Sequence, residues 1–294
     1  MSPPPPIQTP IRRVLLLGAG GMLGRAWRGA LAAHAIECEP ADLPGFDLLD
    51  ADAVRRAVPG CSHVVNCAGW TDVDGAEDDE KGATRLNGHA IGPLAAACRD
   101  AGAHLVHYST DYVFAGDAPD PYPPDAVRSP INAYGRSKAV GEELLEESDA
   151  TWTLIRTSWL YAPWGKNFVR TITRLGRERD ELRVVADQRG RPTSAEHLAR
   201  ASLALLAGGR TGVWHLTDAG VCTWCDFARE IARLTGSRCA IEPCTTDEFP
   251  RPARRPANTV LDLDASERIL GPMPDWRANL ADVTRRLPIH ETPK

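Results

Sequence analysis

Three side chains near the middle of the chain have the types and spacing needed to reduce a ketone. Thr110 ends an apolar run, Tyr134 follows 24 residues later, and Lys138 lies four residues beyond Tyr134. Because residues i and i+4 share one face of an α-helix, Tyr134 and Lys138 are expected to point at one site. A neighbouring ammonium favours the phenolate and lowers the pKa of a tyrosine from its ordinary value near ~10. The spacing therefore predicts Tyr134 as a general acid tuned by Lys138, with Thr110 hydrogen-bonded to a substrate oxygen.

A glycine-rich segment, GAGGMLG, lies between an apolar run at residues 14–17 and a helical pattern. The positions Gly18, Gly21 and Gly24 form a variant of the dinucleotide-binding fingerprint. Glycines at such positions allow a tight turn, close approach of the backbone to a pyrophosphate, and close packing of helix on strand. The free N–H groups at the start of the helix would then bind phosphate. The segment predicts a nicotinamide dinucleotide, NADPH or NADH.

An acidic residue lies where the ribose of that cofactor would be bound. Asp42 follows Gly24 by 18 residues, at the expected end of the second strand. A carboxylate there binds the ribose hydroxyls and disfavours a 2′-phosphate, so Asp42 favours NADH over NADPH. A cap of a turn or helix is the alternative role for Asp42. Asp47 and Leu48 are expected to flank the adenine.

Strand-like and helical patterns alternate along the first half of the chain. Apolar runs at 14–17, 63–69, 103–110 and 151–161 are separated by helical stretches, and one more strand is expected at 212–217. This alternation predicts an α/β fold with a Rossmann-like, doubly wound parallel sheet and a smaller C-terminal α/β substrate lobe. Residues 166–183 are predicted to be helical, and residues 243–256 irregular.

The expected domain boundaries follow from these patterns. Residues 1–10, MSPPPPIQTP, are expected to be a flexible proline-rich tail. Residues 11–160, with about 211–220, are expected to form the dinucleotide-binding domain. The remaining segments, 161–210 and 221–294, are expected to form the lobe that binds the sugar nucleotide.

Composition excludes several classes of function. The 294 residues carry a net charge of −5, which argues against nucleic acid as a partner. No apolar run approaches the ~18 residues of a membrane span, and the start of the chain does not resemble a secretory signal, so a cytoplasmic location is expected. Cys222 and Cys225 form a lone C-x-x-C, which could be a redox pair or half of a zinc site. No second pair completes a zinc site, so two reduced thiols at a helix start are favoured.

These motifs resemble those of the dTDP-4-dehydrorhamnose reductases, a family within the extended short-chain dehydrogenase/reductase superfamily. Matching segments run from residue 11 to about 285 and include HYSTDYVFAG, SPINAYGRSKAVGEE, LIRTSWLYA and VVADQRGRPT. The STDYVF and RTSWLY segments are more specific than a glycine fingerprint. The resemblance implies NAD(P)H-dependent reduction of the C4 ketone of dTDP-4-dehydro-L-rhamnose to dTDP-L-rhamnose. The hydride would come from the nicotinamide and the proton from Tyr134.

The resemblance also implies roles for individual residues of this sequence. It implies that the catalytic residues Tyr134 and Lys138 also contact the cofactor. Further cofactor contacts would come from Met22, Leu23, Gly69, Trp70, Thr71 and Tyr108. Substrate contacts would come from Thr110, Asp111, Trp159, Asn167 and Arg255. The Trp159 indole would pack against the sugar ring, with a core aromatic as the alternative. An arginine fork suits a diphosphate, but Arg251, Arg254 and Arg255 lie too close together in sequence to choose between them.

The sequence departs from the family in two places, and other functions stay open. Some family members dimerise through a magnesium ion held by glutamates, but Ala26 occupies the position of one of them, so no metal is predicted. The oligomeric state is left as monomer or homodimer. Gly69 and Trp70 replace smaller or different residues beside the nicotinamide.

One alternative function is that of a 4-ketoreductase for another dTDP-deoxysugar. A second is a non-catalytic nucleotide-binding subunit, like the regulatory subunit of methionine adenosyltransferase. A sugar-nucleotide epimerase or dehydratase is disfavoured, because Asp111 stands without a second acidic residue.

Overall fold

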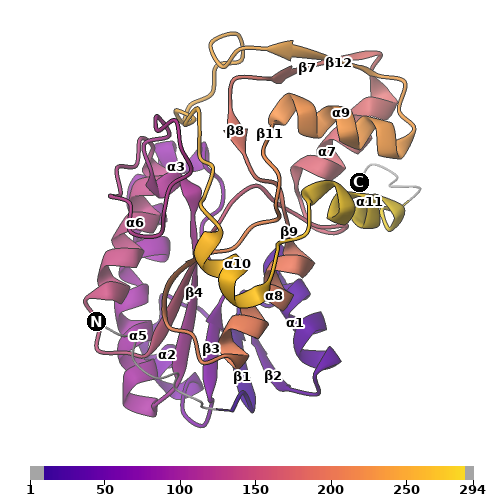
Figure 1. Ribbon diagram of the computed structural model, residues 1–294. Helices are drawn as coiled ribbons and strands as arrows, with labels where there is room; N and C mark the ends of the chain where they lie inside the picture. Colours follow the sequence, from indigo (N-terminus) through magenta and orange to yellow (C-terminus); the bar gives the residue numbers. More distant parts are fainter. Residues whose placement is uncertain (1–9, 289–294) are drawn as a thin grey trace.

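The computed structural model describes residues 10–288, and its centre is a six-stranded parallel sheet of order β10-β5-β4-β3-β1-β2 (Figure 1). Every neighbouring pair in this sheet is parallel. Its strands are β1 (Arg13–Leu17), β2 (Glu37–Ala41), β3 (His63–Asn66), β4 (His104–Thr110), β5 (Trp152–Thr157) and β10 (Gly212–His215). Strands β3 and β4 are buried along their whole length, as expected where helices cover both faces.

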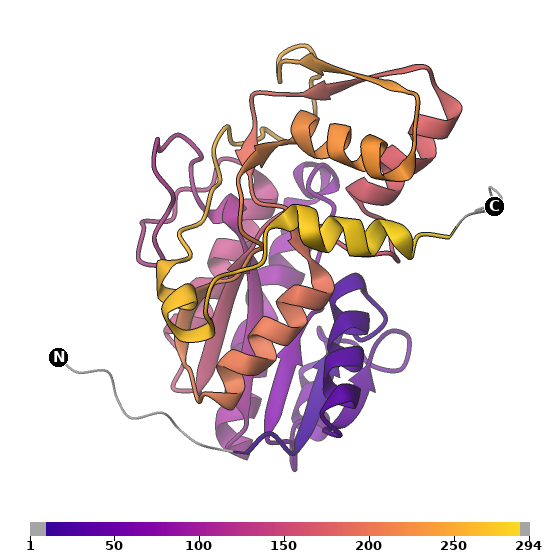
Figure 2. The same ribbon diagram turned by 45° about the vertical axis from the view of Figure 1, so that its right-hand side comes forward.

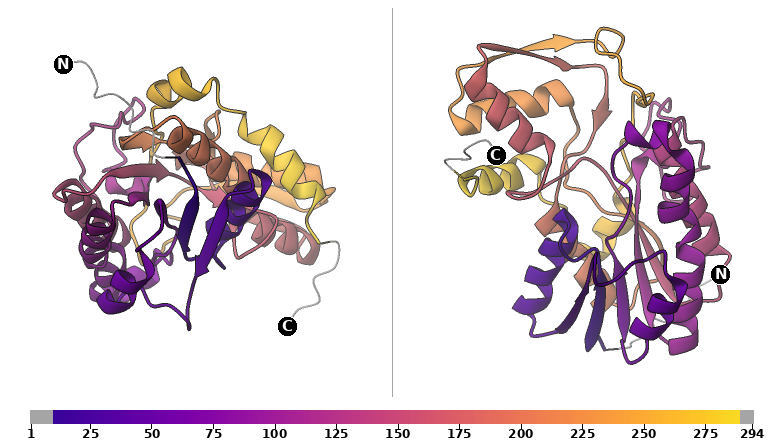
Figure 3. Two further views of the ribbon diagram at one scale, coloured as in Figure 1. Left: turned by 90° about the horizontal axis from the view of Figure 1, so that it is seen from below. Right: turned by 180° about the vertical axis from the view of Figure 1, so that it is seen from behind.

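Helices cover both faces of the sheet because alternate residues of β1 point to opposite sides. Leu16 packs on the face that carries α1 (Met22–Ala33) and α8 (Ala195–Ala207), which lie side by side in Figure 2. Leu15 and Leu17 pack on the face that carries α2 (Ala51–Ala57), α5 (Ile91–Ala101) and α6 (Ala133–Glu146) (Figure 3). The sheet thus has the doubly wound architecture that the sequence predicted.

A smaller α/β lobe lies above the sheet in Figure 1 and has its own core around Tyr161, Phe227 and Trp276. Its helices are α7 (Phe168–Glu178), α9 (Trp224–Thr235) and α11 (Trp276–Arg285). Its strands form three pairs, β7 (Glu181–Val185) with β12 (Ala240–Cys244), β8 (Arg189–Gly190) with β11 (Cys222–Thr223), and β6 (Leu160–Tyr161) with β9 (Thr193–Ser194).

The remaining elements are short and pack on the half of the molecule that contains the sheet. They are α3 (Gly75–Asp78), α4 (Glu80–Thr84), the π-helical turn η1 (Arg85–His89), the 3₁₀ turn η2 (Asp111–Val113) and α10 (Asp264–Leu270). Helix α10 packs against α8 and β10, and Leu261 forms a bridge with Tyr122. Part of the segment expected in the C-terminal lobe therefore packs on the half of the molecule that contains the sheet.

Most expected elements lie where the sequence placed them, with one clear exception. The predicted helix over 166–183 was too long, because α7 ends at Glu178 and the next residue is already extended. The following residues, ELRVV, alternate between exposed and buried positions, which is a strand pattern, and they form β7. The tail expected at residues 1–10 lies outside the described residues except for Pro10. Within residues 10–288, no helix is long and apolar enough to cross a membrane.

Candidate active site

The glycine segment forms a cradle between β1 and α1. Gly18 has a positive φ of 71°, and a Cβ there would lie 2.6 Å from the backbone nitrogen of Ala68. A Cβ on Gly24 would clash with the carbonyl oxygen of Gly18. Gly21 caps α1, whose first turn contains no acidic residue to compete with a phosphate for its N–H groups. This backbone fits the pyrophosphate of a dinucleotide bound at the helix N-terminus.

The residues expected at the adenosine end differ in their exposure. Asp42 is exposed directly after β2, and its carboxylate accepts a hydrogen bond from the Gly20 N–H. It therefore lies beside the glycine cradle, where a ribose would be. The Asp47 carboxylate accepts from the Leu49 N–H at 2.9 Å and closes a turn. Leu48 is buried in the core below α2, so its side chain offers little surface to an adenine.

Met22 and Leu23, the first two residues of α1, also have different surroundings. The Met22 carbonyl accepts a hydrogen bond from the Trp164 indole at 3.0 Å, so a loop of the upper lobe contacts the start of the helix. The Leu23 side chain is buried in the core between α1 and the sheet. Only backbone atoms of Leu23 can therefore face a cofactor.

The loop after β3 lies against the helix that carries the tyrosine and lysine. A Cβ on Gly69 would lie 3.4 Å from Lys138 Nζ, so this loop approaches the lysine closely. Asn87 holds the loop in place, because its side chain accepts from the Trp70 N–H at 2.8 Å and donates to the Trp70 carbonyl at 3.0 Å. The same amide donates to Ser137 Oγ on α6 at 2.9 Å. Thr71 is exposed on this loop. No role was predicted for Asn87 from the sequence.

Lys138 is buried and held by the backbone of β4. Its Nζ donates to the Tyr108 carbonyl at 2.9 Å. Burial lowers the pKa of Lys138 to about 8, against the charges of Glu142 and Cys67, which raise it. The Tyr108 side chain points elsewhere, since its hydroxyl accepts from the Trp27 indole at 2.8 Å and donates to Ser202 at 2.7 Å. Only the carbonyl of Tyr108 therefore belongs to the site.

Tyr134 stands in the first turn of α6, and Thr110 is the last residue of β4. Burial raises the pKa of Tyr134 above its ordinary value, and the Asp111 charge adds to this, while a hydrogen bond with Thr110 opposes it. The expectation that Lys138 lowers the pKa of Tyr134 does not hold here, because Lys138 pairs with the Tyr108 carbonyl and desolvation of the phenol prevails. The raised pKa keeps Tyr134 protonated at neutral pH, the state that a general acid requires.

Asp111 is a buried carboxyl group beside Thr110, with 2 % of its surface exposed. Its Oδ1 accepts from the Thr110 hydroxyl at 2.9 Å, whereas its Oδ2 is buried without a hydrogen-bond partner among the described residues. Burial raises the pKa of Asp111 to about 7, and hydrogen bonds from Thr259 and Thr110 only partly oppose this. The folded protein thus keeps a carboxyl group that ionises near neutral pH next to the tyrosine.

The raised pKa of Asp111 predicts a pH-dependent cost in stability. Between the ordinary pKa of 3.8 and about 7, the folded state binds the proton more strongly than the unfolded state, so stability is lost as the pH rises through this window. We expect Asp111→Asn to have a higher Tm than the wild type at pH 8, with a difference that becomes smaller as the pH falls toward 4. Thermal unfolding of both proteins from pH 5 to 8 measures this, and a Tm difference that is independent of pH would contradict it.

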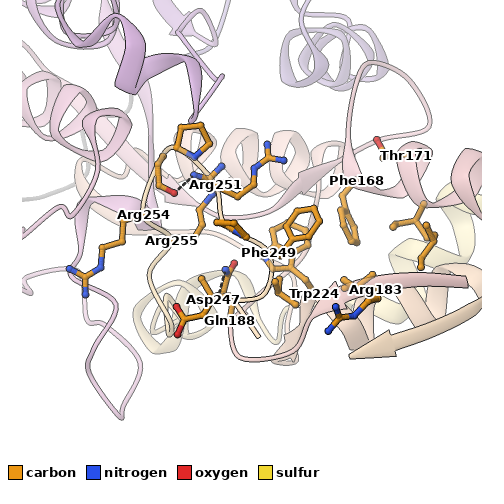
Figure 4. Close-up of a pocket in the computed structure, with 18 of the residues that line it drawn as sticks. Phe168, Thr171, Arg183, Gln188, Trp224, Asp247, Phe249, Arg251, Arg254 and Arg255 are labelled. Carbon is orange, nitrogen blue, oxygen red and sulfur yellow. Dashed lines mark hydrogen bonds between the residues drawn. The ribbon is translucent and has the colours of Figure 1, made fainter. Parts of the chain in front are cut away.

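A pocket of about 730 Å³ opens beside this site, in the upper lobe (Figure 4). Phe168, Trp224 and Phe249 give it an aromatic wall, and arginines line another part. Tyr112 also lines the pocket, and its ring makes an edge contact with the Tyr134 ring at 6.2 Å between centroids. The pocket therefore runs from aromatic and cationic groups to the neighbourhood of Tyr134, which suits a nucleoside diphosphate carrying a sugar.

Trp159 is packed more tightly than the sequence analysis expected. Its indole stacks on Trp224 with 3.6 Å between centroids, and a Cβ on Gly190 would come within 2.6 Å of the same ring. Trp159 also has a positive φ of 45°, which is rare for an aromatic residue. Trp224 covers one face of this partly buried indole, and the contact of Trp159 with a sugar ring stays a prediction. The edge of the indole remains a candidate contact.

Other side chains that were expected to contact the substrate form hydrogen bonds or ion pairs within the protein. The Asn167 side chain caps α7, because Oδ1 accepts from the Arg170 N–H at 3.2 Å and Nδ2 donates to the Ala162 and Trp164 carbonyls. Asn167 therefore has a structural role. Arg251 and Arg255 both contact Asp74, whereas the Arg254 side chain extends away from the aromatic wall in Figure 4. Arg251 and Arg255 are the better candidates for a diphosphate.

No group of three or more His, Cys, Asp or Glu side chains within residues 10–288 could hold a metal ion. Ala26 is buried on α1.

Cys222 and Cys225 are free and buried in the core of the lobe, and burial raises the pKa of both thiols. Raised thiol pKa values disfavour the reactive thiolate, so these cysteines behave as small apolar side chains.

Residues 12–288 match the family described as the RmlD substrate binding domain. The chain belongs to this family. A dTDP-4-dehydrorhamnose reductase of Burkholderia thailandensis is 42 % identical over 289 residues, covering 90 % of this chain and 95 % of its own. The dTDP-4-keto-6-deoxy-D-glucose reductase of Streptomyces niveus is also 42 % identical, covering 91 % and 95 %.

A solved structure extends this similarity to three dimensions. The dTDP-4-dehydrorhamnose reductase of Bacillus anthracis, solved in complex with NADP, is 35 % identical with a TM-score of 0.89. The alignment covers 92 % of this chain and 98 % of that one. This member of the RmlD substrate binding domain family thus shares the fold of a reductase over nearly its whole length.

Proposed function

We propose that this protein reduces the C4 ketone of dTDP-4-dehydro-L-rhamnose to dTDP-L-rhamnose, with NADPH or NADH as the hydride source. The observation that carries the proposal is the position of α6. This helix places Lys138 against the loop after β3, on the cofactor side, and Tyr134 beside Tyr112 at the end of the pocket. The names of relatives that match over nine-tenths of the chain support the same activity.

The side chains divide the chemistry between them. The nicotinamide, when bound, supplies the hydride to the carbonyl carbon. Tyr134, held protonated by burial, gives its proton to the carbonyl oxygen, and the Thr110 hydroxyl donates to that oxygen after it turns away from Asp111. Lys138, with a pKa of about 8, is mostly charged at neutral pH and is held against the Tyr108 carbonyl. Its position beside Gly69 also suits a hydrogen bond to the nicotinamide ribose.

A second candidate substrate is the 4-keto form of another dTDP-deoxysugar. The relative from Streptomyces niveus is named for dTDP-4-keto-6-deoxy-D-glucose and is as similar to this chain as the relative from Burkholderia thailandensis. A probable dTDP-sugar 4-ketoreductase of Streptomyces antibioticus is 42 % identical too. The common substrate class is therefore a dTDP-4-keto-6-deoxysugar, and the two proposals differ only in the stereochemistry of the sugar.

The test is oxidation of NADPH and of NADH, followed at the nicotinamide absorbance, with dTDP-4-dehydro-L-rhamnose as substrate. We expect oxidation that requires this sugar nucleotide, with NADH accepted because Asp42 lies beside the glycine cradle. Oxidation only with dTDP-4-keto-6-deoxy-D-glucose would move the assignment to the second candidate. A folded protein that binds the cofactor but oxidises it with neither sugar would contradict both.

We further propose a reducing, cytoplasmic setting and a monomer or homodimer. All eight cysteines of the chain lie among the described residues and are free, which is typical of proteins kept in a reducing compartment. Size-exclusion chromatography with light scattering measures the oligomeric state.

A further inference from the structure

Asp74 connects the loop after β3 to the arginines that line the pocket. It immediately precedes α3, and its Oδ2 accepts from Arg251 Nε at 3.0 Å, with a second contact from Nη2 of the same arginine. Its Oδ1 lies 3.0 Å from Arg255 Nη1 and accepts from the Ala253 N–H at 3.2 Å. One carboxylate thus holds two guanidinium groups and the backbone between them.

Water reaches the two arginines of this contact unequally, since half of the Arg251 side chain is exposed. The Asp74 side chain is only 16 % exposed, and so is that of Arg255. Burial raises the pKa of Asp74, but hydrogen bonds from Arg251, the Ala253 N–H and Arg255 offset it, so the pKa lies below its ordinary value. Asp74 is therefore ionised at neutral pH, and its charge is screened less at Arg255 than at the more exposed Arg251.

The arginine segment, residues 249–256, is also tied to the helix that carries Tyr134. Asn132 donates from Nδ2 to the Arg254 carbonyl at 2.9 Å, and its Oδ1 caps α6 by accepting from the Gly135 N–H at 2.8 Å. Residues far apart in sequence therefore fix this segment between the loop after β3 and the start of α6. The two arginines are placed relative to Tyr134 by the protein itself.

Two guanidinium groups that line one pocket repel each other unless an anion lies between them. Asp74 supplies one negative charge for two positive ones, so the cluster keeps a net positive charge for a ligand. A diphosphate bound at Arg251 and Arg255 would meet groups already held in place, which reduces the entropy lost on binding. We propose that Asp74 is a positioning residue for the substrate diphosphate and acts through Arg251 and Arg255. This inference rests on the proposed function, because it takes a nucleoside diphosphate as the ligand.

The experiment compares the binding of dTDP and of thymidine by calorimetry, in the presence of NADPH. We expect Asp74→Asn to weaken dTDP binding by about tenfold. The neutral amide loses the charged contacts that hold Arg251 and Arg255 in position. Thymidine binding should be unchanged, because thymidine lacks the diphosphate. In an Arg251→Met/Arg255→Met background, Asp74→Asn should have no further effect on dTDP. Asp100→Asn, which breaks an exposed ion pair with Arg99, is the matched control.

The outcomes separate this inference from the proposed function. Equal or tighter dTDP binding by Asp74→Asn would overturn the role of Asp74, because the carboxylate would then be a competitor of the diphosphate. Equal loss of dTDP and thymidine would also overturn it, since that indicates a general structural effect. A wild-type protein that binds NADPH but not dTDP would contradict the proposed function itself.

Discussion

Replacing Tyr134 with phenylalanine is expected to lower kcat by a factor of about 10²–10⁴, the usual contribution of a general acid. The ring and its packing stay, but the group that gives a proton to the carbonyl oxygen is lost. The affinity for NADPH should change little, because the glycine cradle and Lys138 are untouched. Steady-state rates with dTDP-4-dehydro-L-rhamnose, together with a fluorescence titration of NADPH, measure both effects.

Tyr112→Phe is the matched comparison for this variant. It removes a hydroxyl from a ring 6.2 Å away that lines the same pocket. We expect a loss in kcat well below that of Tyr134→Phe, because Tyr112 transfers no proton. If Tyr134→Phe kept more than a tenth of the wild-type kcat, Tyr134 would not be the general acid.

Replacing Arg156 with methionine is expected to lower the free energy of unfolding by about 3–5 kcal/mol, the usual cost of breaking a buried ion pair. Arg156 is 2 % exposed, and its Nε and Nη2 donate to both carboxylate oxygens of Glu142 at 3.0 and 2.7 Å. Glu142 is fully buried on α6, and without Arg156 its ion pair with Arg128 and the more distant charge of Lys138 would remain. Urea unfolding at neutral pH measures this loss.

Two further variants test the cause of that loss. Replacing both partners, in Arg156→Met/Glu142→Met, should recover part of the stability because no buried charge is left alone. Arg174→Met, which breaks an exposed ion pair with Glu178, should cost less than about 1 kcal/mol. If Arg156→Met cost no more than Arg174→Met, the Arg156–Glu142 pair would not stabilise the fold as described.

The sequence predicted the parts of the fold that depend on local patterns. Short apolar runs such as 14–17 became buried parallel strands, and GAGGMLG became the turn between β1 and α1. Asp42 and Thr110 could be placed at strand ends because each follows or ends an apolar run. The spacing of four between Tyr134 and Lys138 placed both on one helix. The chemical roles assigned to these side chains stay predictions.

The sequence could not predict features that depend on contacts between distant segments. Nothing near Asp74 indicates its arginine partners, which lie 177 or more residues away. The pKa of Tyr134 was expected to follow from Lys138, but burial raises it instead. A motif gives residue types but not their neighbours, so the stacking of Trp159 on Trp224 and the capping of α7 by Asn167 could not be predicted.

The position of β10 at the edge of the sheet affects how the nascent chain folds during its synthesis. Strand β5 ends at Thr157 and gains its outer neighbour only when residues 212–215 have been made. The bridge between Tyr122 and Leu261 likewise forms only after Leu261 has been made. At a synthesis rate of roughly 5–20 residues per second, the open edge of β5 persists for several seconds on the nascent chain. An unpaired strand edge can join strands of other chains. During this part of its synthesis, the unpaired edge of β5 is therefore a site that chaperones can protect.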